Sequence, residues 1–92
     1  MAKLHYLIPR SDVESEERRL LAALNAGGYA AEGLNLSDLA RQAVTRTAME
    51  WVSAVDIEIV EADWATTPDG GAEILFLFHD ADDAERARLA LD

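Results

Sequence analysis

Hydrophobic and polar residues alternate with a period of two in three segments of the chain, which is the spacing of a half-buried β-strand. These segments are residues 3–8, 55–64 and 72–79, and Pro9 terminates the first of them. The segment 66–71 between the last two has the Thr, Pro, Asp and Gly composition of a turn. The last two strands are therefore expected to form a hairpin.

Apolar residues recur at steps of three and four in the remaining segments, which predicts helices. The first helix is expected to begin at Ser11, because Ser11 and Glu14 have the spacing of a capping box, and to stop at Gly27 and Gly28.

The second helix has the clearest apolar stripe, starts with Asn35 or Ser37 as its cap and ends near Ser53. Trp51 lies on this stripe and is assigned to the core. A last helix over residues 80–91 opens with acids, as the helix dipole favours.

The order strand, helix, helix, strand, strand, helix predicts a single α+β domain over residues 1–92. Strands joined through helices are normally parallel and hairpin strands are antiparallel, so a three-stranded mixed sheet with the helices on one face is expected. The segment from Glu73 to Leu91 looks like the third strand and second helix of a ferredoxin-like domain. The whole connectivity resembles that fold without its last strand, a resemblance that concerns the fold alone.

The alternation divides the predicted sheet into two faces. One face is uniformly apolar and is expected to carry the helices: Leu4, Tyr6, Ile8, Val55, Ile57, Ile59, Ile74, Phe76 and Phe78. The other face mixes polar residues with a set of large apolar ones: Leu7, Val60, Trp64, Leu75 and Leu77. Because soluble proteins seldom leave a large apolar patch in water, we expect a second copy of the chain to cover this face. The alternative is that one of the helices folds over it.

Four polar residues fall on the same second face: His5, Glu58, Glu73 and His79. Two imidazoles and a carboxylate suit zinc or iron. The alternative interpretation of the function is a small-ligand or metal-binding protein or enzyme that uses a cleft near His5, Glu58, Trp64 and His79. The other interpretation is ordinary polar residues at the rim of an apolar patch. The chain has no cysteine, and its serines fit helix ends. No catalytic residue, cofactor or metal ligand is therefore assigned, and a non-enzymatic protein is favoured.

The negative charge is concentrated in the second half of the chain. The net charge is −10, whereas residues 1–46 carry six acids and six bases, so the whole excess lies in residues 47–92. Such a field repels nucleic acid, whose binding needs Lys and Arg, and attracts a basic protein partner. Mimicry of a nucleic-acid backbone is one form of that attraction, and simple solubility is the alternative.

The chain shows no sign of an oxidising or membrane environment. It lacks cysteine, and its longest apolar run, residues 74–78, is far shorter than a membrane span of about 20 residues. Its first residues lack the apolar stretch of a signal peptide. We therefore expect a cytoplasmic interaction module that forms a homodimer.

Overall fold

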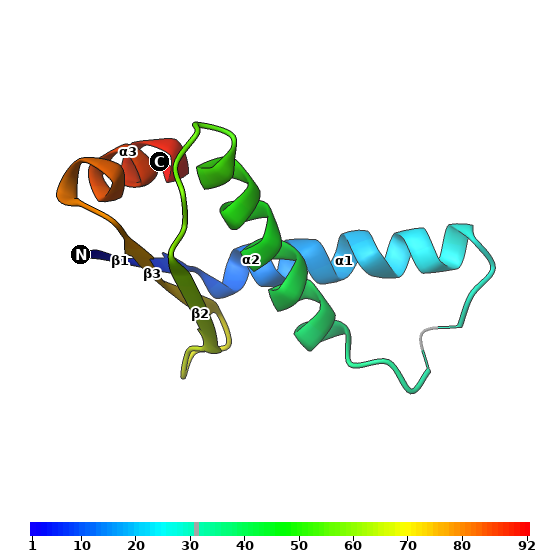
Figure 1. Cartoon of the computed structure of the whole chain (residues 1–92). Helices are drawn as coiled ribbons and strands as arrows, with labels where there is room; N and C mark the ends of the chain where they lie inside the picture. The colour runs from blue at the N-terminus through cyan, green and yellow to red at the C-terminus, as the bar shows by residue number, and fades with distance from the viewer. Residues whose placement is uncertain (31) are drawn as a thin grey trace.

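The computed structural model describes residues 1–30 and 32–92 and confirms the predicted order of elements. Over these residues the elements are β1 (Ala2–Ile8), α1 (Arg10–Ala26), α2 (Leu36–Ser53), β2 (Glu61–Thr66), β3 (Ala72–Phe78) and α3 (Ala81–Leu91). The strands form a sheet in the order β1-β3-β2, with the helices on one side of it (Figure 1).

The sheet is antiparallel, so the predicted mixed sheet is wrong. Both neighbouring pairs, β1 with β3 and β2 with β3, run antiparallel. The crossover through α1 and α2 does leave β1 and β2 pointing the same way, as expected. The hairpin strand β3 inserts between them, however, and therefore no parallel pair forms.

The core lies between β3 and the helices, and the burial of β3 alternates along its length. Ile74, Phe76 and Phe78 are fully buried, and the rings of Phe76 and Phe78 stack with centroids 5.6 Å apart. Leu4 and Tyr6 of β1 stand opposite Phe76 and Ile74 on the same face. The predicted inner face is thus confirmed along β1 and β3.

The end of α1 agrees with the prediction, and its start does not. The stop is correct: Gly27 caps α1, and Gly28 has a φ of +77°, which glycine adopts without strain. The capping box is wrong, because α1 begins at Arg10 with Pro9 as its N-cap and without a side-chain cap. The Pro9 carbonyl instead accepts the first bond, from the Asp12 N–H at 3.0 Å.

The strand predicted at 55–64 forms only from Glu61 onward. α2 ends at Ser53 as expected, but a turn follows in which Asp56 has a φ of +59°. Ile57 is buried and Ile59 packs against the core, as their alternation predicts, although neither lies in a strand. Val55 was predicted to be inside and is 39% exposed.

The molecule is elongated. Its radius of gyration is 14.8 Å, against about 12 Å for an average domain of this length. Figure 1 shows the cause: α2 crosses the first half of α1, and the C-terminal part of α1 extends away from the sheet. The molecule therefore has a sheet end, which carries α3, and a helical end.

Candidate functional site

One face of the sheet is covered by none of the helices that the described residues form. Because residues directly opposite each other in a sheet share a face, Leu7 lies with Glu73, and His5 lies with Leu75. Leu7 is 59% exposed and Leu75 is 43% exposed. The alternative in which a helix of the described chain folds over this face is therefore wrong. We call this surface the open face: Lys3, His5 and Leu7 of β1, Glu73, Leu75 and Leu77 of β3, and Glu61, Asp63 and Ala65 of β2.

Charge is segregated across the open face. Its β1 edge carries Lys3 and His5, and its β2 edge carries Glu61 and Asp63. The central strand β3 places Leu75 between these edges. The face therefore has Leu75 and Leu77 in the middle, bases along one side and acids along the other, and Glu73 at one end of the central strand.

The strand register moves the Trp64 side chain off the open face and corrects this prediction, although Trp64 still lines a hollow with His5, Glu73 and Leu75. Trp64 stands opposite Ile74, so its side chain belongs to the helix side of the sheet. The alternation changes sense at Val60, whose N–H donates to the Leu77 carbonyl at 2.9 Å although Glu61 is the residue opposite Leu77. This extra residue acts as a β-bulge and moves all later side chains to the other face.

The predicted polar site divides into two separate pairs. His5 Nε2 lies 2.8 Å from Glu73 Oε2, and His79 Nε2 lies 2.8 Å from Glu58 Oε2. The two histidines do not form a cross-strand pair, because the residue opposite His5 is Leu75. Within residues 1–30 and 32–92, no three His, Cys, Asp or Glu side chains gather in a way that suits a metal ion.

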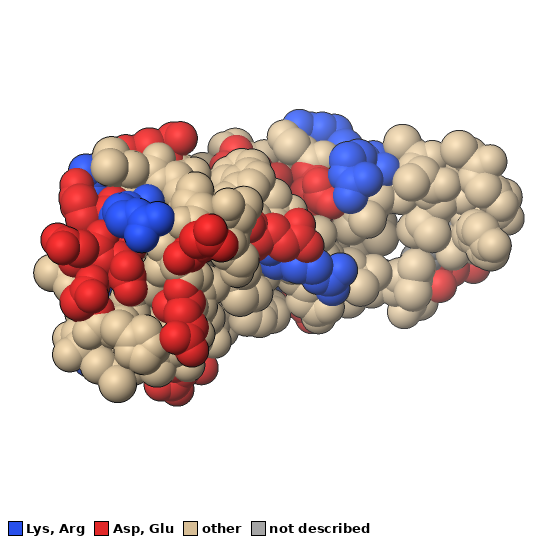
Figure 2. Space-filling model, turned by 45° about the horizontal axis from the view of Figure 1, so that its top comes forward, with Lys and Arg blue, Asp and Glu red and all other residues tan. Residues whose placement is uncertain are grey.

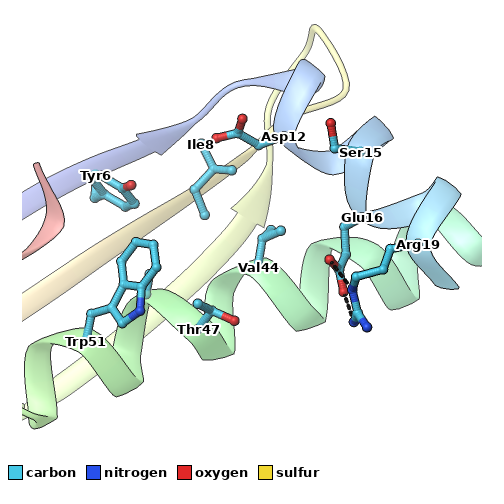
Figure 3. Close-up of a pocket in the computed structure, with 10 residues that line it drawn as sticks. Tyr6, Ile8, Asp12, Ser15, Glu16, Arg19, Val44, Thr47 and Trp51 are labelled. Atoms are coloured by element: carbon cyan, nitrogen blue, oxygen red, sulfur yellow. Dashed lines mark hydrogen bonds and ion pairs between the residues drawn. The ribbon is translucent and has the colours of Figure 1, made fainter.

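A cavity of about 360 Å³ lies between β1, α1 and α2, and sequence reasoning missed it (Figure 3). Tyr6 and Trp51 line one end of it, and the ion pair of Glu16 with Arg19 lines the other (Figure 3). Trp51 was assigned to the core but is 52% exposed. The apolar stripe on α2 could not predict the exposure of Trp51, because that exposure depends on how α2 crosses the sheet.

The acid groups around this cavity leave it negative. The pKa of the Tyr6 hydroxyl is raised, first by burial and then by the charges of Asp12 and Asp92. The charge of Glu16 is balanced by that of Arg19, whose guanidinium holds the pKa of the Glu16 carboxyl below its usual range. Asp12 has no cation within ion-pair distance among the described residues. The cavity therefore combines two aromatic rings with an uncompensated carboxylate.

Figure 2 shows how charge is spread over one face of the molecule. Acidic side chains gather at the sheet end, whereas the surface of the helical end is largely uncharged. This arrangement agrees with the sequence, in which residues 47–92 carry twelve acids against two bases.

Comparisons of the chain with family models, curated proteins and solved structures give no match. The described residues contain no helix with the length and apolar character that crossing a bilayer requires.

Proposed function

We propose that this protein is a small non-enzymatic interaction module that forms a homodimer through its open face and presents its acidic surface to a basic protein. The observation that carries the proposal is the exposure of Leu7 and Leu75 on a sheet face without a helix. A half-apolar sheet face of this kind is unusual in a monomer, and a two-fold dimer needs only one self-complementary surface.

The charges on the open face favour one dimer geometry. A two-fold axis parallel to β3 would stack β1 of one protomer over β2 of its partner. Lys3 and His5 would then face Glu61 and Asp63 across the interface, twice in each dimer. An axis perpendicular to the strands would instead stack acids on acids, which is unfavourable.

The size of the face indicates a weak dimer. With strands about 4.8 Å apart and about 3.3 Å per residue, its flat footprint is roughly 300 Å². Stable interfaces bury about 800 Å² of accessible surface per partner. We therefore propose a dimer that dissociates on dilution.

We also propose that the fold is a ferredoxin-like domain without its last strand and that the protein is cytoplasmic. The strand order β1-β3-β2 with antiparallel neighbours is the order that a ferredoxin-like domain without its last strand would have. The lack of cysteine is consistent with a cytoplasmic protein.

The test is the solution mass of Leu75→Glu, measured by light scattering over a range of concentrations. We expect the wild type to approach about 20 kDa, twice the 10.1 kDa of the chain, and the variant to remain at the monomer mass. Leu89→Glu is the matched control, because Leu89 is a similarly exposed leucine on α3. Circular dichroism verifies that both variants fold. Equal masses for wild type and Leu75→Glu would contradict the proposal.

A further inference from the structure

The backbone of β1 has a free edge. Two hydrogen bonds of the hairpin fix the direction of the groups on β3: Thr67 N–H donates to the Gly71 carbonyl at 3.3 Å, and Val60 N–H donates to the Leu77 carbonyl. In an antiparallel strand the N–H and C=O of one residue point to the same side. The odd-numbered residues of β3 therefore bond to β2 and the even-numbered ones bond to β1.

The partners across the β1–β3 pair then assign the groups of β1. Leu4 and Tyr6 stand opposite even-numbered residues and bond to β3. Lys3, His5 and Leu7 consequently direct their N–H and C=O groups away from the sheet. Apart from its pairing with β3, no hydrogen bond reaches the backbone of Ala2–Ile8 from the described part of the chain.

This edge lacks most of the features that usually protect an outer strand. Its register with β3 is continuous from Ala2 to Ile8, without a bulge or an internal proline. Within β1, Lys3 is the one residue of the charged type that discourages an edge strand from pairing with another chain. The β2 edge is shielded better, because Glu61 and Asp63 stand along it and a bulge precedes it. β1 is therefore the edge that is suited to accept a further strand.

The cavity lies beside this edge. Its lining residues come from β1, α1 and α2, and β2 and β3 contribute none, which places it on the outer side of β1. A strand added to β1 would hold one residue opposite Tyr6, with its side chain on the same face. That side chain would enter the cavity, with Trp51 and Val44 along its stem and Asp12 near its end (Figure 3).

Charge decides what kind of side chain fits. Asp12 lacks an ion-pair partner among the described residues, and two aromatic rings stand nearby. A cation gains from both, by charge attraction and by cation–π contact with Trp51. A second copy of β1 is less suitable, because an antiparallel copy centred on His5 would place Leu4, which has no charge, opposite Tyr6 and would add another net charge of −10.

We propose that the free edge of β1 binds an extended basic segment of a partner protein as a fourth strand, with one arginine or lysine side chain in the cavity between Tyr6, Trp51 and Asp12. This proposal deepens the proposed function by identifying the basic partner's binding mode, and it rests on that function only for the existence of such a partner. It does not depend on the dimer, because the open face and the β1 edge are different surfaces.

The probe is a capped peptide that alternates arginine with valine and matches β1 in length. Binding is followed by NMR at several salt concentrations. We expect the amides of Lys3, His5 and Leu7 to shift and to gain protection from hydrogen exchange. A peptide N-methylated at the residues that face β1 should bind at least about tenfold more weakly, because it cannot donate those bonds.

Variants of the protein test the cavity and the edge separately. Asp12→Asn and Trp51→Ala should each weaken binding roughly fivefold. Trp64→Ala is the matched control for Trp51 and should bind as the wild type does. His5→Pro removes the central edge donor and should abolish binding, whereas His5→Thr loses the same contact with Glu73 but retains the N–H and should bind.

Three results would overturn the proposal. One is equal affinity for the N-methylated and unmodified peptides. This comparison uses the wild-type protein, so it does not depend on whether His5→Pro folds. Another is a set of shifts confined to the acids of α3, which would show adsorption to the acidic surface. The third is edge amides that are already protected in the free protein and lose protection on dilution, which would show that a second copy occupies the edge. Leu75→Glu should bind the peptide normally, so failure of the dimer is distinguishable from failure of this proposal.

Discussion

Glu16 and Arg19, one turn apart in α1, form an ion pair whose pH dependence can be worked out. The Arg19 Nε donates to Glu16 Oε2 at 2.9 Å, and this hydrogen bonding is the main reason that the Glu16 pKa lies below its ordinary value of 4.5. A lowered carboxyl pKa means that the unfolded chain binds the proton more readily. The stabilisation is therefore present above about pH 4.5 and is lost as the pH falls through the lower, folded pKa.

We expect Glu16→Gln to reduce the free energy of unfolding by about 0.5 kcal/mol at neutral pH, the size of a helix ion pair. The difference should shrink as the pH falls below about 4.5 and vanish below the lower, folded pKa, where Glu16 is protonated in both states. Urea unfolding at neutral pH and at a series of lower pH values measures this. A difference that persists at the lowest pH would assign the effect to lost packing.

Gly71 is required by close packing at the start of β3. A Cβ at this position would lie 2.4 Å from the Ile8 carbonyl oxygen and 3.1 Å from the Arg10 nitrogen. Both atoms belong to the backbone and cannot rotate away, so the strand and the start of α1 would have to separate.

We expect Gly71→Ala to lower the free energy of unfolding by about 2–3 kcal/mol, as overpacking does. Gly28→Ala is the comparison, because its Cβ would meet nothing within 4 Å while its φ is +77°. That variant should lose about 1 kcal/mol through backbone strain alone. Equal losses would show that the contact with Ile8 relaxes easily.

At the scale of elements, α2 and α3 each begin with a side-chain cap, whereas α1 does not. The Asn35 side chain accepts from the Asp38 N–H at 3.1 Å, and the Asp80 side chain accepts from the Asp83 N–H at 2.9 Å. α1 begins at Pro9 without a side-chain cap, although Ser11 stands close by.

Alanine at the two capping positions should therefore cost about 1 kcal/mol each, whereas Ser11→Ala should leave the free energy of unfolding nearly unchanged. Thermal or urea unfolding of the three single variants measures this. A large loss for Ser11→Ala would show that the capping box predicted from the sequence forms after all.

The same elements show what local pattern can predict. The cap of α2 was expected at Asn35 or Ser37 and is Asn35. The end of α2 at Ser53 and the hairpin of β2 with β3 were also expected, and all three features depend on residues close in sequence. The start of β2 was missed because the bulge at Val60 is a feature of pairing with Leu77, which lies seventeen positions away. The exposure of Trp51 was missed for a related reason, since it depends on how α2 crosses the sheet.

At the scale of the whole molecule, the open face was predictable and the strand order was not. Alternation along β1 and β3 places Leu7 and Leu75 on one face whatever the order of strands. Which strand becomes central depends on the packing of all three helices, and no local pattern records it. The free edge of β1 and its cavity follow from that order, so they could not be predicted from the sequence.

The elongated shape has a consequence for local stability. Val13, near the start of α1, is fully buried, whereas Leu21 is 39% exposed and Leu20 and Leu24 are half-buried. The last turns of α1 lie away from the sheet (Figure 1). Segments with few buried apolar contacts open by local fluctuations that do not require global unfolding.

We expect amides of residues 20–26 to exchange with solvent much faster than those of Ile74 and Phe76, which are fully buried in β3. Their exchange should also depend weakly on urea, because opening two helical turns exposes little surface, whereas exchange of the β3 amides should follow global unfolding. Native-state hydrogen exchange at several urea concentrations measures both quantities. Val13→Ala should speed exchange in β3 by lowering global stability while leaving residues 20–26 nearly unchanged. If both segments instead respond equally to urea and to Val13→Ala, the helical end unfolds together with the sheet, and the molecule is one cooperative unit despite its shape.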